Sequence, residues 1–171
     1  MIYLIMALAI AARFIPGAAN FSPVYAGLLF GGAYLKRRDS IWFPILLLAG
    51  SDLLVNSLLY HTSFQWMQIL NWVAFAGVVM VGWWLKKRVN VRNVLAASVA
   101  GPSVFFLISN LAVWIGGGLY PPTFGGLAAC YAAAIPFYGN SLISAVLFSG
   151  ILFGAYEYHL RRALSQEMAV R

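Results

Sequence analysis

The stretch "GGGLYPPTFGGLAACYAAAIPFYGN" (residues 116–140) decides how the second half of the chain is organised, because it separates two long hydrophobic runs. It is apolar enough to lie in a membrane, but glycine and proline disfavour a helix long enough to cross one. Loops longer than about 15 residues are usually functional. We therefore predict an outer loop over residues 116–140, in which a short helix or re-entrant segment covers the outer mouth of the protein as a lid.

Composition places the whole chain in a membrane. Of its 171 residues, 63% are hydrophobic and only 9% are charged, whereas soluble domains have about 25% charged residues. A soluble chain of this length buries only about 70% of its unfolded surface, which is too little for so many apolar side chains. Residues 1–16 lack the basic start of a signal peptide and further hydrophobic runs follow them, so we expect this segment to remain in the membrane.

Six hydrophobic segments predict a single all-α transmembrane domain, residues 1–171, built as a six-helix bundle. A helix needs roughly 20 residues to cross a bilayer untilted. The first two segments are shorter than this, and we expect them to be tilted, broken or half-buried under protein or a water-filled cavity. The six segments are residues 1–15, 21–35, 41–60, 66–85, 94–115 and 141–160.

Three basic clusters set the expected orientation, because loops rich in lysine and arginine stay in the cytoplasm. The clusters follow the second, fourth and sixth segments, so they all lie on one side and both termini are cytoplasmic. They hold nine of the eleven basic residues and explain the net charge of +7. We expect the lipid bilayer as their partner and no nucleic acid. The clusters are Lys36, Arg37 and Arg38; Lys86, Lys87, Arg88 and Arg92; Arg161 and Arg162.

Asp52 is the only acidic residue well inside a predicted span. A carboxylate at a helix centre costs roughly 3 kcal/mol on insertion scales, so such a residue generally faces the interior of the bundle. Asn56 lies four residues further on and shares its helix face. The two side chains are either a polar wall of a ligand cavity or interhelical hydrogen-bonding groups, for which Asn71, Asn110 or a backbone group are candidate partners.

Asn110 and Trp114 repeat this spacing near the outer end of the fifth segment. A tryptophan at that depth is often an interface anchor, and here it is also a candidate platform for a ligand. Arg13 lies on the outer side, where it can meet an anionic ligand, pair with Asp52 or pack against its neighbours. Together with residues of the outer segments, the candidate ligand-binding set is Arg13, Asn20, Asp52, Asn56, Asn110, Trp114 and Tyr131.

We expect no metal, no cofactor and no catalysis. Cys130 is the only cysteine and has no basic neighbour in sequence that would activate its thiol. His61 and His159 lie far apart, which makes a histidine metal site improbable. The sequence has no nucleophile with a base, no phosphate loop and no dinucleotide-binding turn. We therefore predict that the chain is not an enzyme.

Ala7 and Ala11 form a small-xxx-small pair in the first segment, and residues 27–32 ("GLLFGG") form a second ridge of small side chains. Such ridges let membrane helices approach closely. They either pack inside this bundle or form docking faces for a second membrane protein.

Several stretches resemble a prokaryotic membrane family of unknown function whose members are sometimes described as putative transport proteins. The stretches are "RFIPGAANFSPV" (13–24), "LFGGAY" (29–34), "SD" (51–52), "FFLISNLAVW" (105–114) and "GGLYPPTFGGLAACYAAAIPF" (117–137). They cover most of the chain in the right order. The resemblance implies a multi-pass protein of the prokaryotic inner membrane and assigns no substrate.

A more distant resemblance is to the substrate-binding S components of energy-coupling-factor vitamin transporters. It implies six helices, cytoplasmic termini and outer loops that close over a vitamin, so that residues 116–140 would cap the ligand. It also implies that Ala7 and Ala11 dock on a coupling subunit. The chain departs from the family pattern at Gly17, Gly139 and Ala145, where polar residues are expected, which favours a poorer pocket.

Two functions follow. The first is an S-component-like protein that captures a vitamin-like small molecule from outside and releases it through an ATP-driven partner. The alternative is a non-catalytic accessory subunit of a larger membrane complex, respiratory or photosynthetic, which keeps the fold and has lost the ligand.

Overall fold

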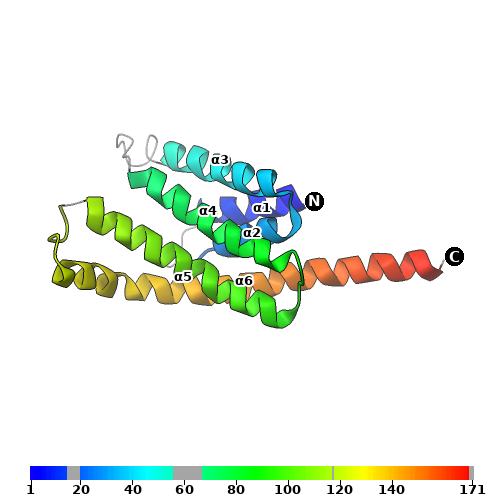
Figure 1. Cartoon of the computed structure of the whole chain (residues 1–171). Helices are drawn as coiled ribbons and strands as arrows, with labels where there is room; N and C mark the ends of the chain where they lie inside the picture. The colour runs from blue at the N-terminus through cyan, green and yellow to red at the C-terminus, as the bar shows by residue number, and fades with distance from the viewer. Residues whose placement is uncertain (15–19, 56–66, 117, 170–171) are drawn as a thin grey trace.

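The computed structural model describes residues 1–14, 20–55, 67–116 and 118–169, and every regular element in these ranges is helical (Figure 1). The prediction of an all-α protein with six helices is confirmed. In chain order the elements are α1 (Ile2–Ala11), the 3-10 helix η1 (Ala12–Phe14), α2 (Val24–Tyr34), α3 (Arg37–Val55), α4 (Met67–Leu85), α5 (Val91–Gly116) and α6 (Phe124–Ala169).

Within the described residues, three helices are long and apolar enough to cross a membrane: α4, α5 and the part of α6 from Phe124 to Ala163. Helices of this kind are typical of integral membrane proteins. α3 has 19 residues, but its first turn is charged and Asp52 lies inside it, so it is the least apolar of the long helices. In Figure 1, α3 lies beside α4 and runs in the opposite direction.

The first two helices are short, as predicted. α1 has 10 residues and α2 has 11, which gives lengths of about 15 Å and 17 Å at 1.5 Å per residue. The hydrocarbon core of a bilayer is about 30 Å thick. In Figure 1, α1 begins at the end of the bundle that carries the N-terminus, and α2 returns toward that end. The two helices therefore form a hairpin that extends along only part of the length of the bundle.

α2 is the central helix of the bundle, because every residue from Val24 to Ala33 is buried. Its glycines allow the close packing. A Cβ at Gly32 would lie 2.5 Å from the carbonyl oxygen of Val79 and 2.9 Å from the Cα of Gly82. A Cβ at Gly27 would lie 2.7 Å from the Cβ of Ala9. The small-residue ridge at residues 27–32 therefore packs inside this protein.

The predicted lid is replaced by the first half of a continuous helix. α6 runs for 46 residues from Phe124, so only residues 117–123 connect it to α5. Thr123 caps the helix, because its Oγ1 accepts a hydrogen bond from the backbone N–H of Gly126 at 3.1 Å. The alanine-rich residues 128–134 favour helix, and α6 continues through Pro136, which transmembrane helices tolerate when neighbouring groups satisfy the freed carbonyl.

The glycines after Thr123 belong to the first turn of this helix and do not break it. A Cβ at Gly126 would lie 2.0 Å from the carbonyl oxygen of Pro121. Only glycine therefore allows the connection to pass this close to the first turn of α6. The predicted span over residues 141–160 is the second half of the same helix.

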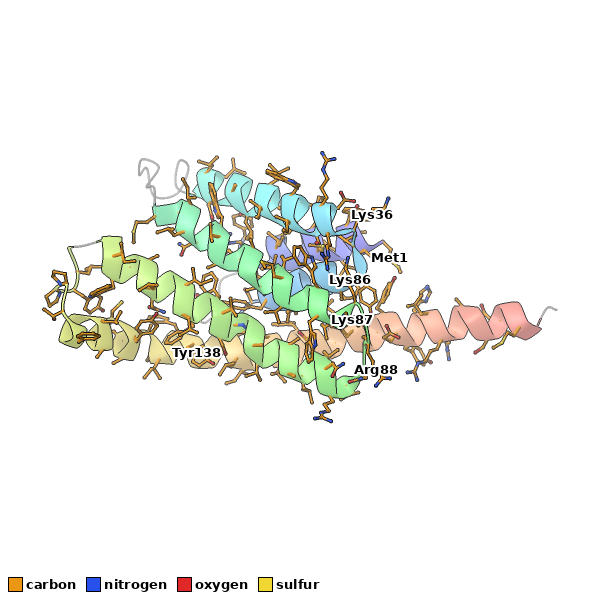
Figure 2. All side chains as sticks on the ribbon, viewed as in Figure 1. Met1, Lys36, Lys86, Lys87, Arg88 and Tyr138 are labelled. Atoms are coloured by element: carbon orange, nitrogen blue, oxygen red, sulfur yellow. The ribbon has the colours of Figure 1, made fainter. Side chains whose placement is uncertain are left out.

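The basic clusters gather at one end of the bundle. Figure 2 shows Lys36, Lys86, Lys87 and Arg88 at the end where Met1 lies. The last part of α6 projects beyond the bundle at this same end (Figure 1). Lys86 donates a hydrogen bond to the carbonyl oxygen of Leu35, and the guanidinium of Arg37 lies 5.2 Å from the ring centroid of Trp83. We call this the basic end.

Candidate functional site

A partly buried ion pair and its hydrogen bonds join η1, α3 and α4. The Nη2 atom of Arg13, in η1, lies 2.6 Å from Oδ1 of Asp52 in α3. The other carboxylate oxygen accepts hydrogen bonds from Nε2 of Gln68 at 2.6 Å and from Nε1 of Trp72 at 2.9 Å. Arg13 also donates to Oγ of Ser51 at 3.1 Å. One of the predicted alternatives, pairing of Arg13 with Asp52, is what the structure shows.

This polar cluster works as an interhelical joint. The Asp52 side chain is 6% exposed and the Arg13 side chain 28% exposed, and a buried carboxylate without such partners would be strongly unfavourable. The described partners of Asp52 on α4 are Gln68 and Trp72, where the sequence suggested Asn71 or Asn110. Neither Arg13 nor Asp52 lines the pocket described next. Asn56 lies outside the described residues.

A pocket of about 140 Å³ lies where the start of α2 meets α5 and α6. Pro102 to Asn110 of α5 form one wall, about 17 to 29 Å along that helix from its start near the basic end. The pocket is therefore nearer the opposite end of the bundle. Its polar lining residues are Asn20, Tyr25, Ser109, Asn110, Tyr138 and Ser141, and its apolar ones are Pro102, Phe105, Phe106, Ala134 and Phe137.

Irregular backbone forms one side of this pocket. Asn20 has a φ of 61°, a left-handed conformation that asparagine tolerates better than most residues. Its carbonyl oxygen lies 3.5 Å from the donating Oγ of Ser144 on α6, which ties the turn before α2 to the long helix. Non-helical backbone at membrane depth is tolerated where it is buried in protein or lines a cavity. This turn leads into α2, whose first backbone N–H groups have no partners within the helix.

The polar groups of the pocket are held by aromatic packing and hydroxyl contacts. The ring of Tyr25 packs edge-on against Phe105 with centroids 5.6 Å apart, and its hydroxyl accepts from Oγ of Ser141 at 3.4 Å. The hydroxyl of Tyr138, which Figure 2 labels, lies 2.8 Å from Oγ of Ser103. The Tyr138 ring lies 4.6 Å from that of Phe106. Such a lining offers flat apolar surfaces together with hydroxyl and amide groups.

Three of the predicted ligand residues make hydrogen bonds within α5, between α5 and α6, or between α5 and the connection to α6. Nε1 of Trp114 donates to the carbonyl oxygen of Pro121 at 3.0 Å. The Tyr131 hydroxyl donates to the carbonyl oxygen of Leu107 at 2.7 Å. Nδ2 of Asn110 donates to the carbonyl oxygen of Phe106 at 2.8 Å. Of these three residues, Asn110 also lines the pocket, and it meets Asn20 there.

Among the polar residues of the pocket, the sequence did not single out Tyr25, Ser109, Tyr138 and Ser141. Ala134, Tyr138 and Ser141 follow a helical spacing that would have shown a shared face, but this face is visible only if residues 134–141 are helical. The predicted loop over residues 116–140 hid that pattern.

Cys130 is buried, and its thiol lies 3.4 Å from the carbonyl oxygen of Asn110. Among the residues that the structure describes, no three histidine, cysteine, aspartate or glutamate side chains lie close enough together to hold a metal ion.

Ala7 and Ala11 lie on a separate apolar groove of about 290 Å³ between α1 and α3. Gly50 of α3 lines the opposite wall, and a Cβ there would meet no atom within 4 Å. Residues of α1 that pack on the central helix are Ala9, beside Gly27, and Met6, beside Gly31. The small pair therefore faces a groove at the outside of the bundle, whereas residues 27–32 face inward.

Residues 1–167 match the family model described as "Family of unknown function (DUF6580)". The chain belongs to this family. The chain matches no curated protein and no solved structure. Membership confirms the resemblance to a family of unknown function and adds no substrate, so any function for this DUF6580 protein has to come from the geometry of its site.

Proposed function

We propose that this DUF6580 protein captures a small molecule from the outer side of a prokaryotic cytoplasmic membrane, in the manner of a transporter substrate-binding subunit. The pocket between Asn20 and Asn110 is the observation that carries the proposal. It brings together a turn before a short central helix and the faces of two long helices. Binding sites of secondary transporters also use interrupted helices with exposed backbone ends.

The orientation follows from the basic end. Loops rich in lysine and arginine stay in the cytoplasm, so both termini are cytoplasmic and α3 to α6 cross the membrane. The hairpin of α1 and α2 then enters from the cytoplasmic side, and the pocket lies nearer the outer side. This arrangement gives an external solute a site between the start of α2 and helices α5 and α6.

The pocket lining indicates the chemistry of the solute. A cavity of about 150 Å³ in another protein holds one benzene ring, and this pocket has about 140 Å³. The rings of Phe105 and Phe106 offer stacking surfaces. The asparagine amides and tyrosine hydroxyls offer hydrogen bonds, and the start of α2 favours a hydrogen-bond acceptor or a partial negative charge. We infer a single-ring, polar, neutral or weakly anionic molecule.

Release of the captured molecule into the cell requires a partner protein. The groove between α1 and α3 presents Ala7, Ala11 and Gly50, whose small side chains allow a transmembrane helix to approach closely. This groove is the surface that we assign to a coupling subunit driven by ATP.

The alternative is an accessory subunit of a respiratory or photosynthetic complex. The same groove, together with the part of α6 that projects beyond the bundle, favours this alternative, because both offer surfaces to neighbouring subunits.

Purification from native membranes in mild detergent, followed by mass spectrometry of small molecules and proteins, separates the two. A ring-sized compound at stoichiometric amounts, with an ATPase pair and a membrane coupling subunit, supports solute capture. Stoichiometric subunits of a bioenergetic complex and no bound compound would replace this proposal with the alternative.

A further inference from the structure

A second groove lies at the basic end, between the start of α5 and the second half of α6. Its volume is about 180 Å³, and it shares no lining residue with the pocket around Asn110. Val94, Leu95 and Phe153 make it apolar. Gly150 and Gly154 also line it, and a Cβ at either glycine would meet no atom within 4 Å. The two glycines thus leave a channel along the side of α6.

The groove has the depth of one leaflet. Its lining on α6 extends from Gly150 to Arg161, which is about 17 Å along a helix at 1.5 Å per residue. Half of a hydrocarbon core about 30 Å thick is about 15 Å. One end of the groove therefore lies at the level of lipid headgroups when the other lies near the middle of the bilayer.

The mouth of the groove holds one arginine and one glutamate. Arg161 lines it, and among the described residues no carboxylate lies within the 4.0 Å of an ion pair with this guanidinium. Glu157 also lines the groove, but its Oε1 accepts a hydrogen bond from the hydroxyl of Tyr34 at 2.5 Å. Asn90 caps α5 by accepting from the backbone N–H of Asn93, so the positive end of that helix lies at the mouth as well.

We propose that this groove binds an anionic phospholipid, with an acyl chain over Gly150 and Gly154 and the phosphate at Arg161. An apolar groove of leaflet depth suits an acyl chain. A basic pocket between transmembrane helices near the membrane surface suits an anionic headgroup. The spacing of the two glycines also fits a helix–helix contact, but Leu95 and Val91 of α5, 47% and 78% exposed, line the same groove and would obstruct a second helix.

Native mass spectrometry of the full chain in mild detergent, titrated with dioleoyl phosphatidylglycerol or dioleoyl phosphatidylcholine, tests this. Phosphatidylglycerol should bind more tightly. Arg161→Gln should weaken its binding about fivefold, the effect of about 1 kcal/mol per basic residue at an anionic surface. Arg162→Gln is the matched control, because Arg162 stacks over Tyr158 with its guanidinium 4.7 Å from the ring centroid.

Filling the groove should also displace the lipid. The double variant Gly150→Leu/Gly154→Leu fills it from α6, and Leu95→Trp fills it from α5, so the test survives if one variant does not fold. Gly139→Leu is the control, because Gly139 lies on α6 with equally open space and outside the groove. Equal binding of the two lipids, unchanged binding in both filled variants, or a dimer that Gly150→Leu/Gly154→Leu abolishes would overturn the proposal.

Discussion

Arg13 and Asp52 are paired at 2.6 Å across the interface between the first hairpin and α3. The pair is extended by Gln68 and Trp72 into a cluster that links three helices. The buried carboxylate of Asp52 therefore has a structural role between helices. Asp52 ties η1, which follows α1, to α3 and α4.

Removing the carboxylate should therefore destabilise the protein. Asp52→Ala leaves the guanidinium of Arg13 without its partner, and breaking a buried pair costs about 3 to 5 kcal/mol. We expect a value toward the lower end, because Arg13 is 28% exposed. Unfolding by denaturant in lipid nanodiscs measures this. Arg13→Met/Asp52→Leu should recover part of the loss, and equal stability of Asp52→Ala and the wild type would contradict the account.

At Gly32 and Gly82, where α2 crosses α4, any side chain should destabilise the protein. In Gly32→Ala and Gly82→Ala the new Cβ would lie 2.5 Å and 2.6 Å from backbone oxygens of the facing helix, and overpacking of this kind costs about 1 to 3 kcal/mol. Gly50→Ala is the control, because nothing lies within 4 Å of its Cβ position. Thermal unfolding should separate the two groups, and a neutral Gly32→Ala would show that the helices are further apart.

The connection between α5 and α6 should loosen when its two side-chain contacts are removed. Tyr131→Phe and Trp114→Phe each delete one hydrogen bond to a backbone carbonyl, and such bonds in membrane proteins are worth about 0.6 to 1.7 kcal/mol. We expect faster amide hydrogen exchange over residues 118–130 in both variants. Tyr120→Phe is a control in the same connection, and exchange as slow as in the wild type would exclude the bracing role.

The spans between basic clusters were predictable, because uncharged runs bounded by arginine and lysine leave few alternatives. α4 and α5 begin and end within about three residues of the predicted segments, in line with the usual boundary error. The continuous helix α6 was not predictable, because Gly125 and Gly126 are residues that usually break helices, although Gly126 here allows a close approach at the helix start. The pocket was missed for the same reason, because Tyr138 and Ser141 share a face only on a continuous helix.

The orientation can be tested with single cysteines in a Cys130→Ala background. Leu119→Cys, in the connection between α5 and α6, should react with a membrane-impermeant maleimide added to intact cells. Lys87→Cys, at the basic end, should react only after the membrane is opened, because the positive end stays in the cytoplasm. The reverse pattern would place the pocket on the cytoplasmic side and remove the basis for capture from outside.

We propose that the pocket of Asn20 and Asn110 holds a small molecule. The most direct measurement compares Ala134→Phe with Ala133→Phe by mass spectrometry of the compounds that remain bound after purification. Ala134 lines the pocket, whereas Ala133 is exposed on the same helix. We expect a bound compound in the wild type and in Ala133→Phe, and its loss in Ala134→Phe with the protein still folded. A compound retained by Ala134→Phe, or none in any of the three proteins, would contradict it.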